Sequence, residues 1–230
     1  MVAARRTFLG AGHFDPISQA IITTARELLS PDSPATGCAV DVGAGTGHHL
    51  AALLGGLPGH WGLALDASRP ALRSAVRAHP RIAAVACDVW QPLPLRSGVI
   101  DLVLNVFAPR NPPEIARVLS PHGVLVVVTP DANHLRELEE PMAMLKVEPD
   151  KAVRLHGELA PYFDLVARDQ IESQMSLRQD DVKALVEMGP SVHHITTADL
   201  TRRLARQPET VSVTLSTRVE AFRPTVRIGA

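Results

Sequence analysis

The chain has 230 residues, of which 46% are hydrophobic and 20% are charged, and its formal net charge is −1. These values are typical of a globular domain with a sizeable core and exclude a largely disordered chain. The balance of 23 basic against 24 acidic residues also argues against a surface that is basic all over and holds nucleic acid through many phosphate contacts.

Sequence features that indicate compartment or metal binding are few. Cys38 and Cys87 lie in apolar runs, and we expect both to be reduced core residues. No apolar run approaches the ~18 residues of a membrane span, and the start lacks the apolar stretch of a signal peptide, so we expect a soluble, cytoplasmic protein. Neighbouring histidines on a helix point in different directions, so the pairs at 48–49 and 193–194 do not predict a metal site.

The first 37 residues predict a helical region. Apolar residues in "ISQAIITTARELL" recur at helical spacing, and "SPDSPATG" then breaks the pattern. We interpret residues 1–37 as a lid over a main domain that comprises residues 38–230.

Strand and helix patterns alternate in the next part of the chain. The expected strands are "CAVDVG", "HWGLALD", "IAAVACD", "GVIDLVLNVF" and "GVLVVVTP". The helices expected between them are "HHLAALLGGL", "RPALRSAVRAH" and "PPEIARVLS". This alternation predicts parallel βαβ units in an α/β, doubly wound sheet.

The second half departs from that alternation. Residues 131–160 predict a largely helical insertion near the substrate site, interrupted by Pro141 and Pro149. "FDLVARDQIESQMSL" and "TVSVTLSTRVEAFRP" then predict two long strands, with a helix in "RQDDVKALVEMG" between them. We expect these strands to form an antiparallel edge on the mostly parallel sheet.

A glycine-rich loop, "DVGAGTGHHL" at residues 41–50, follows the first strand. A phosphate-binding P-loop needs Lys and then Ser or Thr after its last glycine, whereas His48 and His49 stand there. A dinucleotide site prefers the spacing G-x-G-x-x-G, and a carboxylate such as Asp41 beside the loop would repel a pyrophosphate. That carboxylate suits the ammonium group of S-adenosylmethionine.

Two further acids follow the next two strands. Asp66 could accept hydrogen bonds from ribose hydroxyls, and Asp88 could accept one from the adenine amino group, although either could merely cap a helix or turn. Ligands of open parallel sheets bind beyond the carboxyl ends of the strands, where the loop and these acids should converge. The sequence therefore predicts a Rossmann-like, class I S-adenosylmethionine-dependent methyltransferase. The expected cofactor-binding residues are Asp41, Gly43, Ala44, Gly45, Gly47, His49, Asp66, Ala67, Asp88, Val89 and Asn105. His49 could instead be an ordinary residue at the helix start. His13 and Phe14 of the lid could close over the cofactor or anchor the N-terminal helix.

The methyl acceptor should bind beyond the fourth strand, where "NVFAPR" lies. Phe107 could stack on a flat acceptor or pack in the core, and Arg110 could meet an anion or remain a solvated surface charge. Asn105 could bind either ligand or cap the turn. We take Asn105, Phe107 and Arg110 as the candidate catalytic residues.

Longer motifs carry a narrower resemblance. "LNVFAPRNPPEIARVLSPHGVLVVVTPDANHLREL", with "GTGHHL", "LALDASRPALRSAVRAHP", "CDVWQPLPLRSG" and "MGPS", resembles the 23S rRNA guanine-N1 methyltransferases, the family that includes the tylosin-resistance methyltransferase of actinomycetes. The resemblance covers nearly the whole chain and implies an rRNA hairpin as acceptor, a role in antibiotic resistance and a possible homodimer. Family members begin with a cysteine-rich zinc-binding module, whereas this sequence begins at the stretch that follows it.

Two alternatives stay open on the sequence alone. The acceptor could be a small molecule of actinomycete secondary metabolism. The fold could also have been repurposed for other chemistry, or act as a partner subunit in such a pathway.

Overall fold

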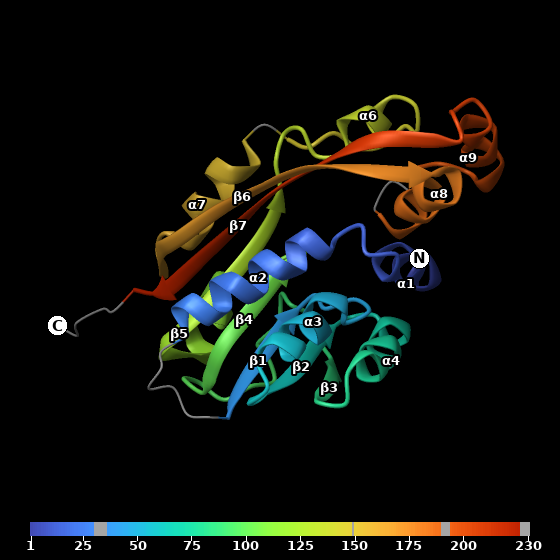
Figure 1. Ribbon diagram of the computed structural model, residues 1–230. Coiled ribbons are helices and arrows are strands. Elements are labelled where there is room, and N and C mark those ends of the chain that lie inside the picture. The colour runs from blue at the N-terminus through green and yellow to red at the C-terminus, as the bar shows by residue number, and fades with distance from the viewer. Residues whose placement is uncertain (30–35, 149, 190–193, 226–230) are drawn as a thin grey trace.

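A computed structural model describes residues 1–29, 36–148, 150–189 and 194–225. Most of the predicted break at 30–37, Pro190 and Ser191 of "MGPS", and His193 lie outside the described residues. Within them, seven strands form one sheet in the order β3-β2-β1-β4-β5-β7-β6 (Figure 1).

The sheet is parallel except at one edge. Its strands are β1 (Gly37–Val42), β2 (His60–Asp66), β3 (Ile82–Ala86), β4 (Ile100–Val106), β5 (Leu119–Pro130), β6 (Phe163–Arg178) and β7 (Thr210–Pro224). Only β7 runs antiparallel to both of its neighbours, β5 and β6. The predicted doubly wound, mostly parallel sheet with an antiparallel edge is confirmed.

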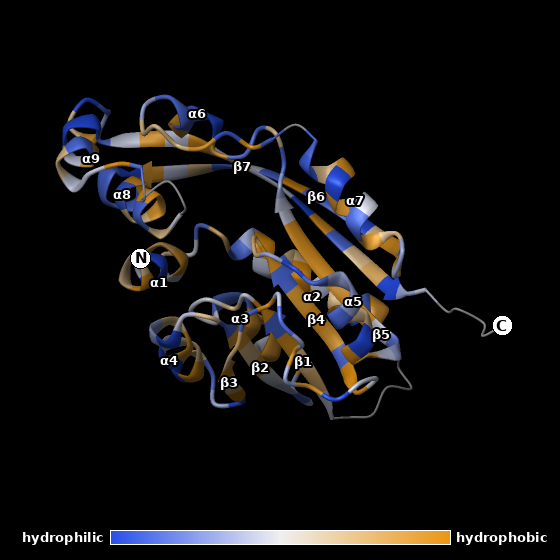
Figure 2. Ribbon diagram, turned by 180° about the vertical axis from the view of Figure 1, so that it is seen from behind, coloured by the Kyte–Doolittle hydropathy of each residue, from blue (hydrophilic) through white to orange (hydrophobic). Residues whose placement is uncertain are grey.

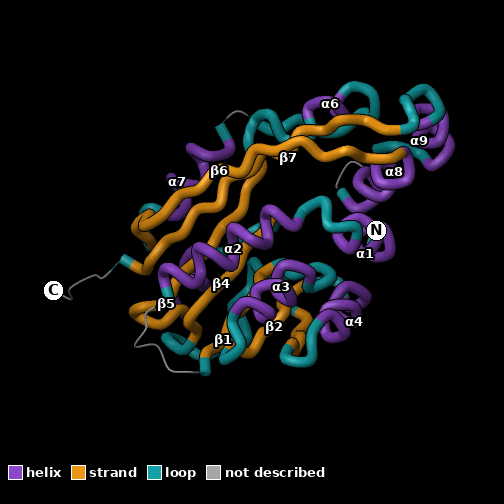
Figure 3. Tube along the Cα trace, viewed as in Figure 1, coloured by secondary structure: helices purple, strands orange, loops and turns teal. Residues whose placement is uncertain are grey.

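Helices cover both faces of this sheet (Figure 3). They are α1 (Val2–Gly10), α2 (Asp15–Leu28), α3 (His48–Gly56), α4 (Arg69–Ala78), α5 (Pro112–Val118), α6 (Arg136–Glu139), α7 (Lys151–Leu159), α8 (Gln179–Met188) and α9 (Thr197–Leu204). The predicted N-terminal helical region is thus confirmed as two helices, α1 and α2.

The alternation of side chains along each strand produces two apolar layers. One face packs against α1 to α4, α8 and α9, and the other packs against α5 and α7. Figure 2 shows hydrophobic residues along the central strands β4 and β5, whereas α9 at the periphery is mostly hydrophilic. Both cysteines are free and half-buried.

The strands β6 and β7 reach beyond the rest of the sheet. Figure 1 shows this pair extending past β4 and β5 to carry α8 and α9, and α8 lies beside the N-terminal helix α1. The N-terminal helix therefore sits at the end of the sheet where β1 and β4 terminate.

The prediction that residues 131–160 are largely helical is wrong for much of that segment. Only α6, which has 4 residues, and α7 are helical, and turns and irregular chain connect them. Pro141 does not continue a helix, and residues 144–148 line a cavity instead of packing against a helix neighbour. Pro149 lies outside the described residues. The third strand also ends at Ala86, two residues before Asp88, and α9 was not predicted.

Candidate active site

The glycine-rich loop joins β1 to α3 with a backbone that only glycine adopts easily. Gly43, Gly45 and Gly47 have φ values of 80°, 55° and 77°. A Cβ atom on Gly43 would lie 2.4 Å from the Cβ of Ala108, and one on Gly47 would lie 2.8 Å from the Cα of Ala75. The backbone N–H groups of Gly43 and Ala44 donate to the carbonyl of Leu65, which ties the loop to β2.

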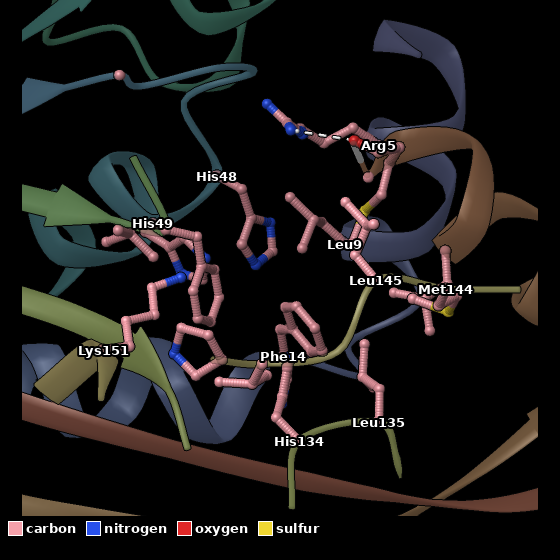
Figure 4. A pocket seen from close by; sticks show the side chains of 18 of the residues that line it. Arg5, Leu9, Phe14, His48, His49, His134, Leu135, Met144, Leu145 and Lys151 are labelled. Atoms are coloured by element: carbon pink, nitrogen blue, oxygen red, sulfur yellow. Dashed lines mark hydrogen bonds between the residues drawn. The ribbon is translucent and has the colours of Figure 1, made fainter. Parts of the chain in front are cut away.

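A cavity of about 440 Å³ opens at this end of the sheet (Figure 4). The predicted site residues in its wall are Phe14, Asp41, Gly43, Ala44, His49 and Phe107. Its wall excludes Gly45, Gly47, Asp66, Ala67, Asp88, Val89, Asn105, Arg110 and His13. The glycine loop, the N-terminal helical segment and the candidate acceptor loop therefore line the same cavity.

Asp41 is a buried carboxylate without a counter-ion. Its side chain lines the cavity, the residue is 3% exposed, and its Oδ1 atom has no hydrogen-bond partner in the described structure. Burial, and then the charge of Asp66, raise the pKa of this carboxyl to about 7. A cationic group in the cavity would offset both the desolvation of the ionised carboxylate and its repulsion by Asp66.

The two acids that follow β2 and β3 are oriented by backbone groups. Asp66 accepts hydrogen bonds from the N–H of Gly45 at 2.8 Å and of Ser68 at 2.7 Å. The exposed Asp88 accepts one from the N–H of Trp90 at 3.0 Å. Carboxylate oxygens accept more than one hydrogen bond, so these contacts orient the two acids without saturating them.

Two adjacent histidines begin α3 and differ in their surroundings. His49 is buried, its Nδ1 lies 2.9 Å from Oγ of Ser18, and burial lowers its pKa to about 3. His48 packs edge-on against His49 and points into the cavity in Figure 4. The ring of His49 therefore stays neutral and joins α3 to α2.

The predicted lid residues lie between α1 and α2. Phe14 is buried, packs edge-on against Phe8 at 5.1 Å between ring centroids, and lies 6.1 Å from Phe107. His13 points elsewhere, with its Nε2 3.3 Å from Oδ1 of Asp181 on α8. Phe14 thus forms part of the cavity wall, while His13 connects the lid to α8.

The loop after β4 presents an aromatic ring to the cavity. Phe107 has a positive φ of 51° and is 40% exposed, and its ring stacks on His134 at 5.8 Å between centroids. A positive φ is uncommon for a bulky residue and is maintained only where the surrounding structure imposes it.

Asn105 and Arg110 impose the conformation of that loop. The fully buried Asn105 donates from Nδ2 to the carbonyls of Val42 and Pro109 and accepts at Oδ1 from Nε of Arg110. Arg110 also pairs with Glu158 at 3.4 Å. Both polar groups are therefore engaged within the loop that carries Phe107.

Sequence reasoning missed several residues in the cavity wall, notably Arg5, His134 and Lys151. Arg5 of α1 reaches over the glycine loop, since a Cβ atom on Gly45 would lie 2.6 Å from its Nη1, and its Nη2 donates to the carbonyl of Met188 (Figure 4). His134 lies in the quoted "DANHLREL" motif, but its segment was expected to be helical. No local pattern pointed to Arg5 or Lys151, because only the fold brings them to the loop.

The fold and the site together define a class of protein. An antiparallel β7 placed between β5 and β6, and a glycine loop after β1 beside a buried acid, characterise a class I S-adenosylmethionine-dependent methyltransferase. A methyltransferase from Geobacter sulfurreducens, solved with S-adenosyl-L-homocysteine, has this fold, with 16% identity, a TM-score of 0.54 and 91% of each chain covered.

Sequence comparison identifies the family. No family model matches the chain. The 23S rRNA (guanine(748)-N(1))-methyltransferase of Streptomyces fradiae is 45% identical over 97% of this chain and 79% of its own length. A putative 23S rRNA (guanine-N(1)-)-methyltransferase of Micromonospora griseorubida matches with the same identity and coverage. The chain belongs to this family of 23S rRNA guanine-N1 methyltransferases.

No described helix has the length and apolar character needed to cross a membrane. No group of three or more His, Cys, Asp or Glu in that part of the chain is arranged to hold a metal ion.

Proposed function

We propose that this protein transfers the methyl group of S-adenosylmethionine to N1 of a guanine in a hairpin of 23S rRNA. One observation carries the proposal: a single cavity joins the glycine loop and the unpaired Asp41 to the exposed ring of Phe107. A methyl donor and a flat acceptor can therefore meet in one place. The names of the relatives that are 45% identical support guanine N1 of rRNA as the acceptor atom.

The residues present fit the donor. Asp41 offers an unsatisfied carboxylate for the ammonium group of the methionine tail, and Arg5 offers a guanidinium for its carboxylate. Gly43 and Ala44 let the backbone approach closely. We assign the ribose to Asp66 and Ala67 and the adenine to Asp88 and Val89, with Gly45 and Gly47 shaping the loop between these parts of the site. Bound S-adenosylmethionine supplies an electrophilic methyl group.

The acceptor side is built around Phe107. Its exposed ring can stack on a base that has been turned out of the RNA hairpin. Asn105 and Arg110 act through the loop they hold together rather than by contact with the base. Lys146, Lys151 and Arg154 also line the cavity and can meet RNA phosphates, with Arg154 partly neutralised by its ion pair to Glu148.

The chemistry that this arrangement supports is mainly positioning. Holding the attacking nitrogen in line with the methyl group can contribute about 7–11 kcal/mol to lowering the barrier. We assign closure over the reacting groups to the lid, residues 1–37, through Phe14, and assign part of the acceptor wall to residues 131–160. The access of bulk water to the transferring methyl is thereby restricted.

The test is methyl transfer from labelled S-adenosylmethionine to a 23S rRNA hairpin that lacks native methylation. We expect label in the RNA and a block to reverse transcription at one guanine, because a methyl on N1 prevents Watson–Crick pairing. The matched control is the same hairpin with that guanine replaced by adenine, which should remain unlabelled. An unlabelled guanine hairpin, although the protein binds S-adenosylhomocysteine, would contradict the proposal.

A further inference from the structure

We propose that His134 is a catalytic residue that donates a hydrogen bond from its Nε2–H to O6 of the target guanine as N1 loses its proton. This inference rests on the proposed function and adds the residue that stabilises the reacting form of the base. Phe107 can bind the face of a purine, but a ring face does not stabilise charge at the edge of the base.

The first support is the position of the ring. His134 lies in the wall of the same cavity as the glycine loop, and it stacks on Phe107 with an angle of 25° between the ring planes. Phe14 packs beside both rings, at 6.0 Å from His134 and 6.1 Å from Phe107. The imidazole is therefore fixed by two aromatic neighbours next to the ring on which the base would stack.

The second support is the tautomer. The backbone N–H of Ser216 on β7 donates to Nδ1 of His134 at 3.4 Å. An Nδ1 atom that accepts a hydrogen bond leaves the proton of the neutral ring on Nε2. The hydrogen bond of the His134 ring among the described residues is the one at Nδ1, and the residue lines the cavity, so the N–H of Nε2 can donate to a ligand.

The third support is the charge state. Burial, and then the charge of Lys151, lower the pKa of His134 to about 4, so the ring is neutral near pH 7. The other charged side chains in the cavity wall are those of Arg5, Asp41, Glu139, Lys146, Glu148 and Arg154. A neutral imidazole can stabilise a developing oxyanion without giving up its own proton, and the cation of Lys151 adds to the favourable field.

The N1 proton passes to water, and the electron pair it leaves is shared between N1 and O6 of the base. The pair on N1 forms the new N–C bond to the methyl carbon while the C–S bond breaks, and its electrons stay on sulfur. His134 holds its proton throughout and stabilises the charge at O6.

The experiment measures kcat for methylation of the RNA hairpin between pH 6.5 and 9 in two variants. H134F keeps an aromatic ring on Phe107 but removes the donor, and we expect kcat near pH 7 to fall about 100-fold. The loss should shrink toward pH 9, where more N1 is ionised without help. H134Q keeps an N–H donor and should recover part of the rate. H122A, which changes an exposed histidine in β5, is the matched control and should behave as wild type.

Binding of S-adenosylhomocysteine, measured by calorimetry, shows that each variant is folded with an intact donor site. A wild-type rate in H134F would overturn the inference and leave the proposed function standing. A loss in H134F that is equal at every pH and is not restored in H134Q would also overturn it, since a purely structural role predicts that result. Failure of the wild type to methylate the RNA would instead remove the proposed function, and this inference with it.

Discussion

We expect the carboxyl group of Asp41 to make cofactor binding at the glycine loop sensitive to pH. Its pKa of about 7 means that it is largely protonated at pH 6 in the free protein, whereas a bound ammonium group favours the ionised form. We expect the affinity for S-adenosylhomocysteine to rise about tenfold per pH unit from pH 5 to 7 and to level off above. Calorimetry in two buffers of different ionisation enthalpy should detect a proton released on binding at pH 6.

The matched variant is D41N, which has no carboxyl group to titrate. It should bind more weakly at pH 7.5, with an affinity that is flat over the same range. A wild-type pH dependence that persists in D41N would show that another group titrates, and the assignment of the ammonium group to Asp41 would then be wrong.

A comparison of Gly47 and Gly55 tests whether the loop needs glycine for its backbone conformation. Gly47 has a positive φ of 77°, and a Cβ atom there would lie 2.8 Å from the Cα of Ala75, whereas a Cβ on Gly55 meets nothing within 4 Å. We expect G47A to lower the free energy of unfolding by about 2 kcal/mol or more and to impair cofactor binding. G55A, on α3, should change stability by less than about 1 kcal/mol, toward greater stability. Urea denaturation measures both, and equal effects would contradict this reading of the loop.

At the scale of elements, the helix α1 brings a cation to a loop that follows it by some forty residues in the chain. Arg5 lies over Gly45 and lines the cavity, whereas Arg6 on the same helix is exposed. We expect R5Q to weaken binding of S-adenosylhomocysteine roughly tenfold to 100-fold, because a charge-assisted hydrogen bond contributes about 1.5–3 kcal/mol. Calorimetry with the decarboxylated analogue of the same ligand should show little difference between R5Q and wild type.

R6Q is the control and should bind both ligands as wild type does. If R5Q lowered the affinity for the two ligands equally, Arg5 would act by positioning α1 and not by binding the carboxylate of the ligand. The comparison thus separates a direct contact from support of the lid.

At the scale of the whole molecule, a buried neutral histidine links stability to pH. The folded pKa of His49 is about 3, well below its unfolded value near 6.5, so the unfolded chain binds more protons between these values. Its contribution is fully present above pH 6.5 and is lost progressively as the pH falls toward 3. From pH 7 to pH 5 we expect a loss of about 2 kcal/mol from this residue.

Urea denaturation of the wild type and of H49Q at both pH values tests this expectation. H49Q cannot take up the proton, so its stability should fall by about 2 kcal/mol less than that of the wild type over this range. If the free energy of unfolding changed equally with pH in both proteins, His49 would become protonated without unfolding the protein.

Elements with a local side-chain pattern were predictable without knowledge of the fold. Strand β2 (His60–Asp66) and strand β7 (Thr210–Pro224) begin and end where their patterns predict, because side-chain alternation along a strand reflects which face is buried. The glycine loop and Asp41 could also be predicted, because a tight turn after a parallel strand restricts which residue types occur at each of its positions. The family motifs were likewise recognisable in the sequence, because each is a short run of neighbouring residues.

The set of distant residues that line the cavity became clear from the folded chain and not from the sequence. Arg5, His134 and Lys151 come from α1, the chain after β5 and α7, and no short-range pattern connects them with Asp41. The irregular backbone of residues 140–148 also escaped prediction, because its apolar residues face a cavity and resemble one side of a helix. Asn105 and Arg110 were recognised as polar residues at a strand end, but whether they face the ligand or hold the loop depends on contacts that only the folded chain makes.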